Sequence, residues 1–296
     1  MTTVASSSPW ARETAGGVRK LVSDLEDWRI VTMHQLQHYL RTYRFLGLLA
    51  LVFVVSALTL TFQVSAGVAT VQVQQFYSSA VYLSSFLTNV GLWIILAAAF
   101  FGGDALSVDF STGAGYYMLV LPIRRSVLLV GRFTAAAIVT FAIVGVYYAF
   151  AIAGGMYFFN GPLSIPWVEV AQSLGLAAVF SLATLSVAFC VSAFTRSPVA
   201  GVLITILALY VGFTTFETVA QLAGLEPWFS LNYAGGAIAS LLNPNFAHEQ
   251  VVPLGRSQSY IVWAATVPEG LAIMAGYIAA FLPLSAYLYY RKEASG

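Results

Sequence analysis

Long apolar stretches separated by short polar segments dominate the chain. A membrane-spanning helix needs about 20 mostly apolar residues, and six stretches reach that length. The third is longer than a bilayer requires, so we expect it to tilt or to end in a polar turn at its FFNGP sequence. Together the six form one predicted transmembrane domain, 44–290, with spans at 45–64, 82–103, 127–157, 168–195, 199–219 and 270–290.

The composition supports the same interpretation. Hydrophobic residues make up 59% of the chain and charged residues only 8%, whereas a soluble domain carries about 25% charged residues. The single cysteine, Cys190, excludes an intrachain disulfide and lies in an apolar stretch, where a thiol acts as a small hydrophobic group. We therefore expect an all-α integral membrane protein. Its net charge of +1 gives no indication of a nucleic acid partner.

The positions of the basic residues predict the orientation. Six spans place both termini on one side, and every lysine and arginine except Arg256 falls on that side. Because cytoplasmic loops carry an excess of Lys and Arg, we expect both termini to be cytoplasmic in the cell membrane of a prokaryote. Residues 1–17 lack the apolar core of a signal peptide and predict a flexible cytoplasmic tail, and 291–296 form a second one.

Residues 18–43 predict an amphipathic helix before the first span. Val18, Leu25 and Trp28 belong to an apolar face at nearly helical spacing, with basic residues elsewhere. Such a helix lies in the headgroup region of a membrane. The alternative is that the same face packs on a partner protein.

The segment 221–267, between the last two spans, is too long and too apolar for a simple loop. Its central part is uncharged, but Gly235, Gly236 and the Asn243-Pro244 pair interrupt it. A seventh span would reverse the C-terminus and break the charge pattern. We expect two short re-entrant helices in the outer leaflet, since broken backbone at that depth must line a cavity or be buried in protein.

Motifs for catalysis are absent from the sequence. The only lysines, Lys20 and Lys292, do not follow a glycine, so there is no phosphate-binding loop for ATP. No Gly-x-Ser-x-Gly motif occurs. The FGGD sequence ending at Asp104 resembles part of an intramembrane aspartyl protease motif, but Phe101 replaces its first glycine and no second intramembrane Asp is present. We expect no enzyme activity, catalytic residue or cofactor in this chain.

Two histidines have the spacing of a zinc pair. His34 and His38 lie four residues apart, but Gln35 stands where a metalloprotease has its glutamate base. His248 is predicted on the opposite face of the membrane. We interpret the pair as histidines on the hydrated face of a helix, and expect no metal site.

Few polar residues lie within the spans. An ion-coupled carrier usually keeps ionisable groups there, and the span centres contain none. Ion-coupled transport is therefore a disfavoured alternative, and a non-transporting membrane anchor or assembly subunit is another. Asn89 and Glu217 are candidate pathway or outer-gate residues. The alternatives are a hydrogen bond between helices for Asn89 and contact with interfacial water for Glu217.

The polar segment 104–126, between the second and third spans, carries the most informative pattern. It contains an acidic residue, two glycines and a Leu-Pro-Ile-Arg-Arg sequence, and a Gly-Arg pair follows early in the next span. With six spans, an amphipathic N-terminal helix and a broken outer segment, the chain resembles the permease subunit of an ABC type-2 exporter over nearly its whole length. The matching residues are Asp109, Gly113, Gly115, 121–125 and Gly131-Arg132, although Asp109 stands where that family more often has Glu.

The resemblance implies that 104–126 is a coupling helix seated in a separate P-loop ATPase subunit, which binds ATP and magnesium. It also implies a dimer with a second copy or a paralogue, and a substrate path bordered by spans one, two and five. The apolar patch and the arginines of this segment suit contact with a partner or with lipid phosphates. The predicted ATPase-coupling residues are Asp109, Leu119, Leu121, Pro122, Arg124 and Arg125.

Overall fold

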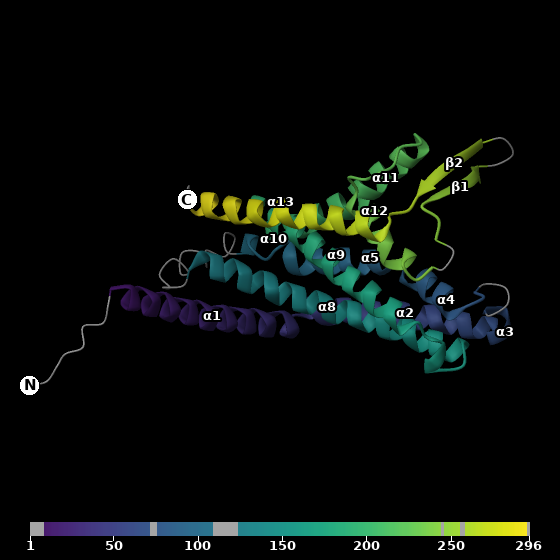
Figure 1. Ribbon diagram of the computed structural model, residues 1–296, viewed down its shortest axis with the longest axis horizontal. Helices are drawn as coiled ribbons and strands as arrows, with labels where there is room; N and C mark the ends of the chain where they lie inside the picture. Colours follow the sequence, from purple (N-terminus) through teal and green to yellow (C-terminus); the bar gives the residue numbers. More distant parts are fainter. Residues whose placement is uncertain (1–8, 72–75, 109–123, 244–245, 255–257, 295–296) are drawn as a thin grey trace, which may run out of the picture.

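The computed structural model describes residues 9–71, 76–108, 124–243, 246–254 and 258–294. Six helical segments are long and apolar enough to cross a membrane, and they alternate in direction along the chain (Figure 1). Each overlaps one predicted span, so the prediction of an α-helical multi-pass membrane protein is confirmed at this level. The segments are Tyr43–Ala66, Ser79–Gly102, Arg125–Phe158, Trp167–Phe194, Pro198–Leu222 and Val267–Arg291.

Two of the six spans are not uniform α-helices. The second is divided at Thr88 and Asn89, and the fifth contains a π-helical segment, η3. Short π-helical segments inside α-helices are rare and are frequent at functional sites. The spans comprise α2 (Tyr43–Ala66), α4 (Ser79–Leu87) with α5 (Val90–Gly102), α8 (Arg125–Phe158), α9 (Trp167–Phe194), α10 (Pro198–Ile206) with η3 (Leu207–Gly212) and α11 (Phe213–Leu222), and α13 (Val267–Ala294); α3 (Val68–Thr70) and η2 (Pro162–Ser164) are short connecting turns.

Local sequence explains where several helices begin. Ser78 precedes α4, and its hydroxyl accepts a hydrogen bond from the amide of Val81 at 3.3 Å, as an N-cap residue does. Pro198 occupies the first turn of α10, where the missing amide proton costs nothing. The cap at Ser78 places the start of the second span before the predicted residue 82.

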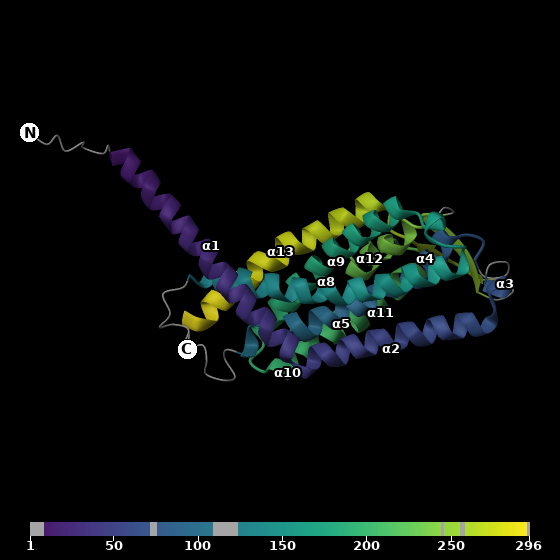
Figure 2. The ribbon, with the colours of Figure 1, turned by 90° about the horizontal axis from the view of Figure 1, so that it is seen from below.

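The N-terminal helix, α1 (Pro9–Arg41), begins at Pro9, earlier than the predicted start at residue 18. It crosses α8 and extends obliquely away from the bundle (Figure 2). At the crossing, a Cβ added to Gly131 would lie 2.7 Å from Val31 Cγ1, so only glycine allows this approach. The Trp28 indole nitrogen also donates to Thr134 Oγ1 at 3.3 Å. One face of the predicted amphipathic helix therefore packs on the transmembrane bundle itself.

The spans divide into an interior group and a peripheral group. In the most apolar windows of the second, third and fourth spans, 56%, 56% and 67% of residues are buried, against 17%, 22% and 11% in the first, fifth and sixth. The peripheral spans thus present apolar side chains to lipid or to another chain. Large side chains at the centre include Leu83, Ile94, Ile143, Phe180, Leu185 and Phe189.

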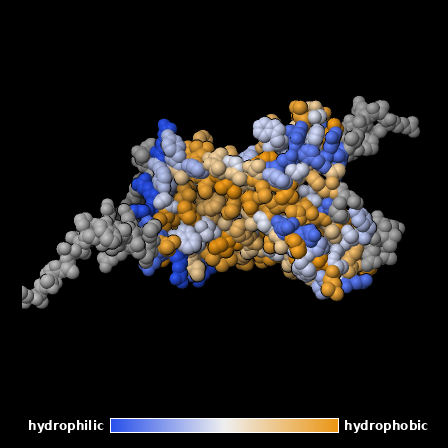
Figure 3. Space-filling view, viewed as in Figure 1, coloured by the Kyte–Doolittle hydropathy of each residue, from blue (hydrophilic) through white to orange (hydrophobic). Residues whose placement is uncertain are grey.

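The two ends of the bundle differ in chemistry. Figure 3 shows hydrophobic residues gathered around the middle of the molecule and hydrophilic residues toward both ends. We call one end the basic end: it is where α2 begins and α5 ends, and both chain termini lie on that side (Figure 1). We call the opposite end the hairpin end. Exposed arginines on this side include Arg29, Arg41, Arg44, Arg124, Arg125, Arg196 and Arg291.

The hairpin end corrects one prediction. In the described part of 221–267 only one helix follows α11, namely α12 (Leu231–Ser240), and the second predicted helix is replaced by strands β1 (Glu249–Leu254) and β2 (Gln258–Trp263). The strands pair antiparallel, with Glu249 opposite Trp263. The QSYIVW sequence of β2 is rich in β-branched and aromatic residues, which favour strands. The prediction of a second helix does not take this strand preference into account.

Candidate functional site

The residues that leave the second span are packed inside the bundle. After α5 ends at Gly102, the chain continues as residues 103–108, which we call the connector segment. Residues 103–107 are buried, and Val108 is half-buried. The connector leads into 109–123, which lie outside the described residues and include predicted coupling residues Asp109, Leu119, Leu121 and Pro122. The first residues of the predicted coupling segment, 104–108, are therefore embedded among helices rather than free at the surface.

An ion pair joins the connector to the first span. Arg44 Nη1 donates a hydrogen bond to Asp104 Oδ2, and Asp104 is only 6% exposed while Arg44 remains half exposed. Burial raises the pKa of Asp104 above its ordinary value, and the adjacent Arg44 guanidinium acts in the opposite direction without reversing the shift. The pair therefore offsets a desolvation penalty as much as it adds stability.

Two side chains hold the connector by its backbone. The buried Arg132 of α8 donates from Nη1 to the carbonyl oxygen of Ala105 at 2.9 Å. The hydroxyl of Ser192 on α9 accepts hydrogen bonds from the amides of Leu106 and Ser107 at 2.9 and 3.1 Å. These contacts satisfy peptide groups that burial would otherwise leave unpaired.

Two further contacts bring α1 and α10 to the same place. The hydroxyl of Tyr39, near the end of α1, donates to the carbonyl oxygen of Phe101 at 2.9 Å; burial raises the pKa of Tyr39, so this donor keeps its proton. A Cβ added to Gly201 of α10 would lie 2.0 Å from the carbonyl oxygen of Gly103. The two backbones thus touch without intervening side chains. We call the connector together with these contacts the junction.

The other end of the undescribed segment is also tied to a helix. Arg124 precedes α8, and its Nη1 lies 2.8 Å from Asp24 Oδ2 on α1. Arg124 and Arg125 are both exposed at the basic end. Of the six predicted coupling residues, these two are the ones that the structure describes, and it exposes both, with Arg124 paired to α1.

A pocket adjoins the break in the second span. It has a volume of about 180 Å³, and Asn89 lines it together with Tyr210 of η3 and Asn232 of α12. Asn232 in turn donates to Thr214 Oγ1 at 3.0 Å. The pocket thus lies where a divided helix, a π-helical segment and α12 meet, which makes Asn89 a lining residue of a partly polar site.

Glu217, the second candidate gate residue, does not line that pocket. It is half-buried on α11, and its Oε1 accepts a hydrogen bond from Gln221 Nε2 at 3.3 Å. The structure therefore does not bring Asn89 and Glu217 into one site.

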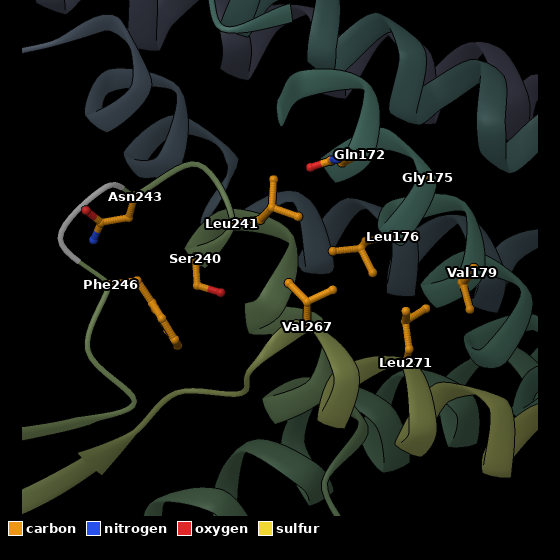
Figure 4. Close-up of a pocket in the computed structure, with 10 residues that line it drawn as sticks. All are labelled: Gln172, Gly175, Leu176, Val179, Ser240, Leu241, Asn243, Phe246, Val267 and Leu271. Carbon is orange, nitrogen blue, oxygen red and sulfur yellow. The ribbon is translucent and has the colours of Figure 1, made fainter. Parts of the chain in front are cut away.

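A larger groove lies on the other side of α12. It has a volume of about 670 Å³ and is bordered by α9, α12, the following loop and the start of α13 (Figure 4). Its lining is mainly aliphatic, with Gln172, Ser240 and Asn243 as polar members. Of the predicted site residues that the structure describes, none lines it.

Sequence reasoning missed most of the junction. In the sequence Asp104 stands out only as a fragment of a protease motif, and no pattern distinguishes Ser192 or Gly201. The contacts come from α1, α2, α8, α9 and α10, and all of them except the Arg44–Asp104 ion pair involve backbone atoms of 101–107. The one signal in the sequence was a charged residue placed directly after an apolar span, with an arginine directly before the preceding span.

No protein-family model matches the chain, and a comparison with curated proteins also gives no match. The arrangement of the junction and the pocket is therefore the basis for assigning a function.

Proposed function

We propose that this chain is the membrane-spanning permease subunit of an ATP-driven exporter of the ABC type-2 class. In this proposal a separate P-loop ATPase binds below the basic end, which faces the cytoplasm of a prokaryotic cell. Segment 104–126 acts as the coupling helix. A second copy or a paralogue completes the translocation path, with the bilayer as the surrounding solvent.

The junction carries this proposal. A force applied to residues 109–123 passes along the connector segment through Ser107 and Leu106, which Ser192 of α9 holds. It then reaches Ala105 and Asp104, whose partners Arg132 and Arg44 lie on α8 and α2. Because protein interiors are close-packed, such a displacement moves the packed helices rather than being absorbed locally. A membrane domain without its own ATP site needs an attachment of this kind to respond to a partner.

The pathway is proposed at the face where the first and fifth spans flank the second. Both α2 and α10 contact α5, and their spans leave most apolar residues uncovered. The pocket of Asn89 lies between α5 and η3. We propose that α12 is the re-entrant helix of the outer leaflet, since its broken surroundings then line a cavity, as irregular backbone inside a membrane must.

The coupling role predicts a specific loss of activity. In the complex isolated from its native membrane in mild detergent, Arg124→Glu/Arg125→Glu should lower magnesium-dependent ATPase activity at least about tenfold, the equivalent of about 1.4 kcal/mol of coupling. The physical reason is that the reversed charges repel acidic groups on the ATPase. Arg291→Glu, an exposed arginine at the same end, is the matched control and should retain activity.

An exchange of the two charges distinguishes a role of Arg124 in docking to a partner from its role in the ion pair with Asp24. Asp24→Arg combined with Arg124→Glu restores the pairing between α1 and α8 but not the charge presented to a partner. If the exchange recovers activity, the arginine acts within the chain and the docking proposal fails. A chain that purifies without any P-loop subunit, or whose subunit shows no nucleotide-driven change, would favour the anchor alternative.

The dimer proposal predicts a position-dependent cross-link. In a Cys190→Ala background, Leu203→Cys on α10 should form an intermolecular disulfide or short-linker cross-link in native membranes. Leu203 is exposed on the proposed face. Leu284→Cys, also exposed (42% against 55% for Leu203) but on α13, is the control and should remain monomeric on a non-reducing gel. The opposite pattern would move the interface to α13.

A further inference from the structure

Three metal-ligating side chains converge at the hairpin end. Glu226 precedes α12, His248 precedes β1, and Glu269 lies in the first turn of α13. One ligand atom from each lies within 4.8 Å of the others. His248 Nε2 is 3.8 Å from Glu226 Oε1, and His248 Nδ1 is 3.9 Å from Glu269 Oε2. Glu226 and His248 are half-buried, and Glu269 is more exposed, with 44% of its side chain accessible.

The histidine is oriented as a metal ligand would be. Its Nδ1 lies 2.9 Å from the carbonyl oxygen of Ala264, so a proton on Nδ1 is donated to the backbone and the lone pair remains on Nε2. This backbone contact is the outer-shell arrangement that usually fixes the tautomer of a ligating histidine. The Trp263 ring packs edge-on against the imidazole at 5.4 Å, which restricts its rotation.

The surroundings of the cluster are strongly negative. The hydroxyl of Tyr233, which is 2% exposed, donates to Glu226 Oε1 at 2.6 Å. The carboxylates of Glu226 and Glu269 both lie close to His248, and a cation placed between them would relieve their mutual repulsion.

From these contacts we propose that Glu226, His248 and Glu269 form a binding site for a divalent transition metal such as Zn²⁺. One imidazole and two carboxylates are a donor set that zinc accepts, with bonds of about 2.0–2.2 Å. Tetrahedral ligands at that distance are about 3.3 Å apart, and the three ligand atoms lie up to 4.8 Å apart, so the side chains need to close by up to about 1.5 Å. Nε2 of His248 already faces Glu226, whereas Glu269 Oε2 lies nearest to Nδ1 and accepts a hydrogen bond from the amide of Thr266. Glu269 therefore has to turn toward Nε2 when the metal binds. A water molecule completes the fourth position.

The bound metal would join three separate segments. Through Glu269 it would hold the first turn of the last span, and through His248 the chain entering the hairpin. The site therefore stabilises the packing of the hairpin end, and it does so whether or not the chain belongs to an exporter.

The test uses the full chain in detergent after removal of metals by chelation. Titration with ZnCl₂ should show one zinc per chain by calorimetry and elemental analysis, with a rise in Tm. Co²⁺ should give the absorption bands of a four-coordinate site. His248→Gln and, separately, Glu269→Gln should weaken zinc binding at least about tenfold and abolish the rise in Tm.

Two matched controls keep the outcome decisive. Glu249→Gln changes an exposed acid next to the cluster, and His34→Gln/His38→Gln removes the exposed histidine pair of α1; both variants should bind zinc normally. Zinc binding that is absent from the parent protein, or that follows His34 and His38 instead of His248, overturns the proposal. If His248→Gln fails to fold, Glu269→Gln decides.

Discussion

Replacing Gly201 with alanine is expected to destabilise the protein by about 3 kcal/mol or more, because there is no space for the added methyl group. Its Cβ would lie 2.0 Å from the carbonyl oxygen of Gly103 and 3.0 Å from Thr195 Oγ1. The first contact is with backbone, which cannot rotate away as a side chain can. Relief requires α10 to separate from the end of α5. Thermal unfolding in detergent, followed by circular dichroism, measures the loss.

Gly145→Ala provides the matched control for this substitution. Gly145 also lies within a helix, and nothing lies within 4 Å of an added Cβ. Alanine there should be neutral or stabilise the protein by up to about 1 kcal/mol, since it has the higher helix propensity. Equal stabilities of the two variants would show that the contact between α5 and α10 is looser than described.

Arg44→Met should cost about 3 kcal/mol, at the lower end of the range for breaking a buried ion pair because Arg44 is half exposed. The substitution leaves Asp104, with a side chain only 8% exposed, without its neutralising partner. Asp104→Asn should cost less, about 1–2 kcal/mol, because the neutral amide leaves no buried charge behind. The double variant should lose less than the sum of the two single losses.

The same pair gives a pH dependence of defined sign. Burial already raises the pKa of Asp104, and loss of Arg44 removes the largest opposing influence. Native Arg44→Met then holds a proton at Asp104 more tightly than the unfolded chain does. Its stability should therefore rise as pH is lowered from 7 toward the ordinary carboxyl value of 3.8. The slope should vanish in Arg44→Met/Asp104→Asn, and a slope that persists there would assign the effect to another group.

The spans were predictable because one strong constraint, about 20 apolar residues across a bilayer, dominates those parts of the sequence. The interruption of the second span at Asn89 could not be predicted, because neither a proline nor a glycine pair lies at that position. The π-helical segment of the fifth span leaves no pattern either. Both irregularities lie against α12, whose Gly235 and Gly236 line the same pocket.

The junction and the metal cluster could not be predicted from the sequence for a different reason. Their members come from segments that meet only in three dimensions, as Glu226, His248 and Glu269 do. The hairpin, in contrast, could have been anticipated from the β-branched and aromatic residues of 258–263. The prediction of two re-entrant helices rests instead on the glycine and asparagine residues earlier in the same segment.

The contacts of Tyr39, Arg132 and Ser192 with backbone atoms have an evolutionary consequence. A peptide carbonyl or amide is the same in every residue, so the side chains of 105 and 106 can change without loss of these hydrogen bonds. Across homologues, substitutions should accumulate at Ala105 and Leu106 within limits of size, while the three donor and acceptor side chains on neighbouring helices should be retained. Conservation at this junction would then be found mainly in residues outside the connector segment.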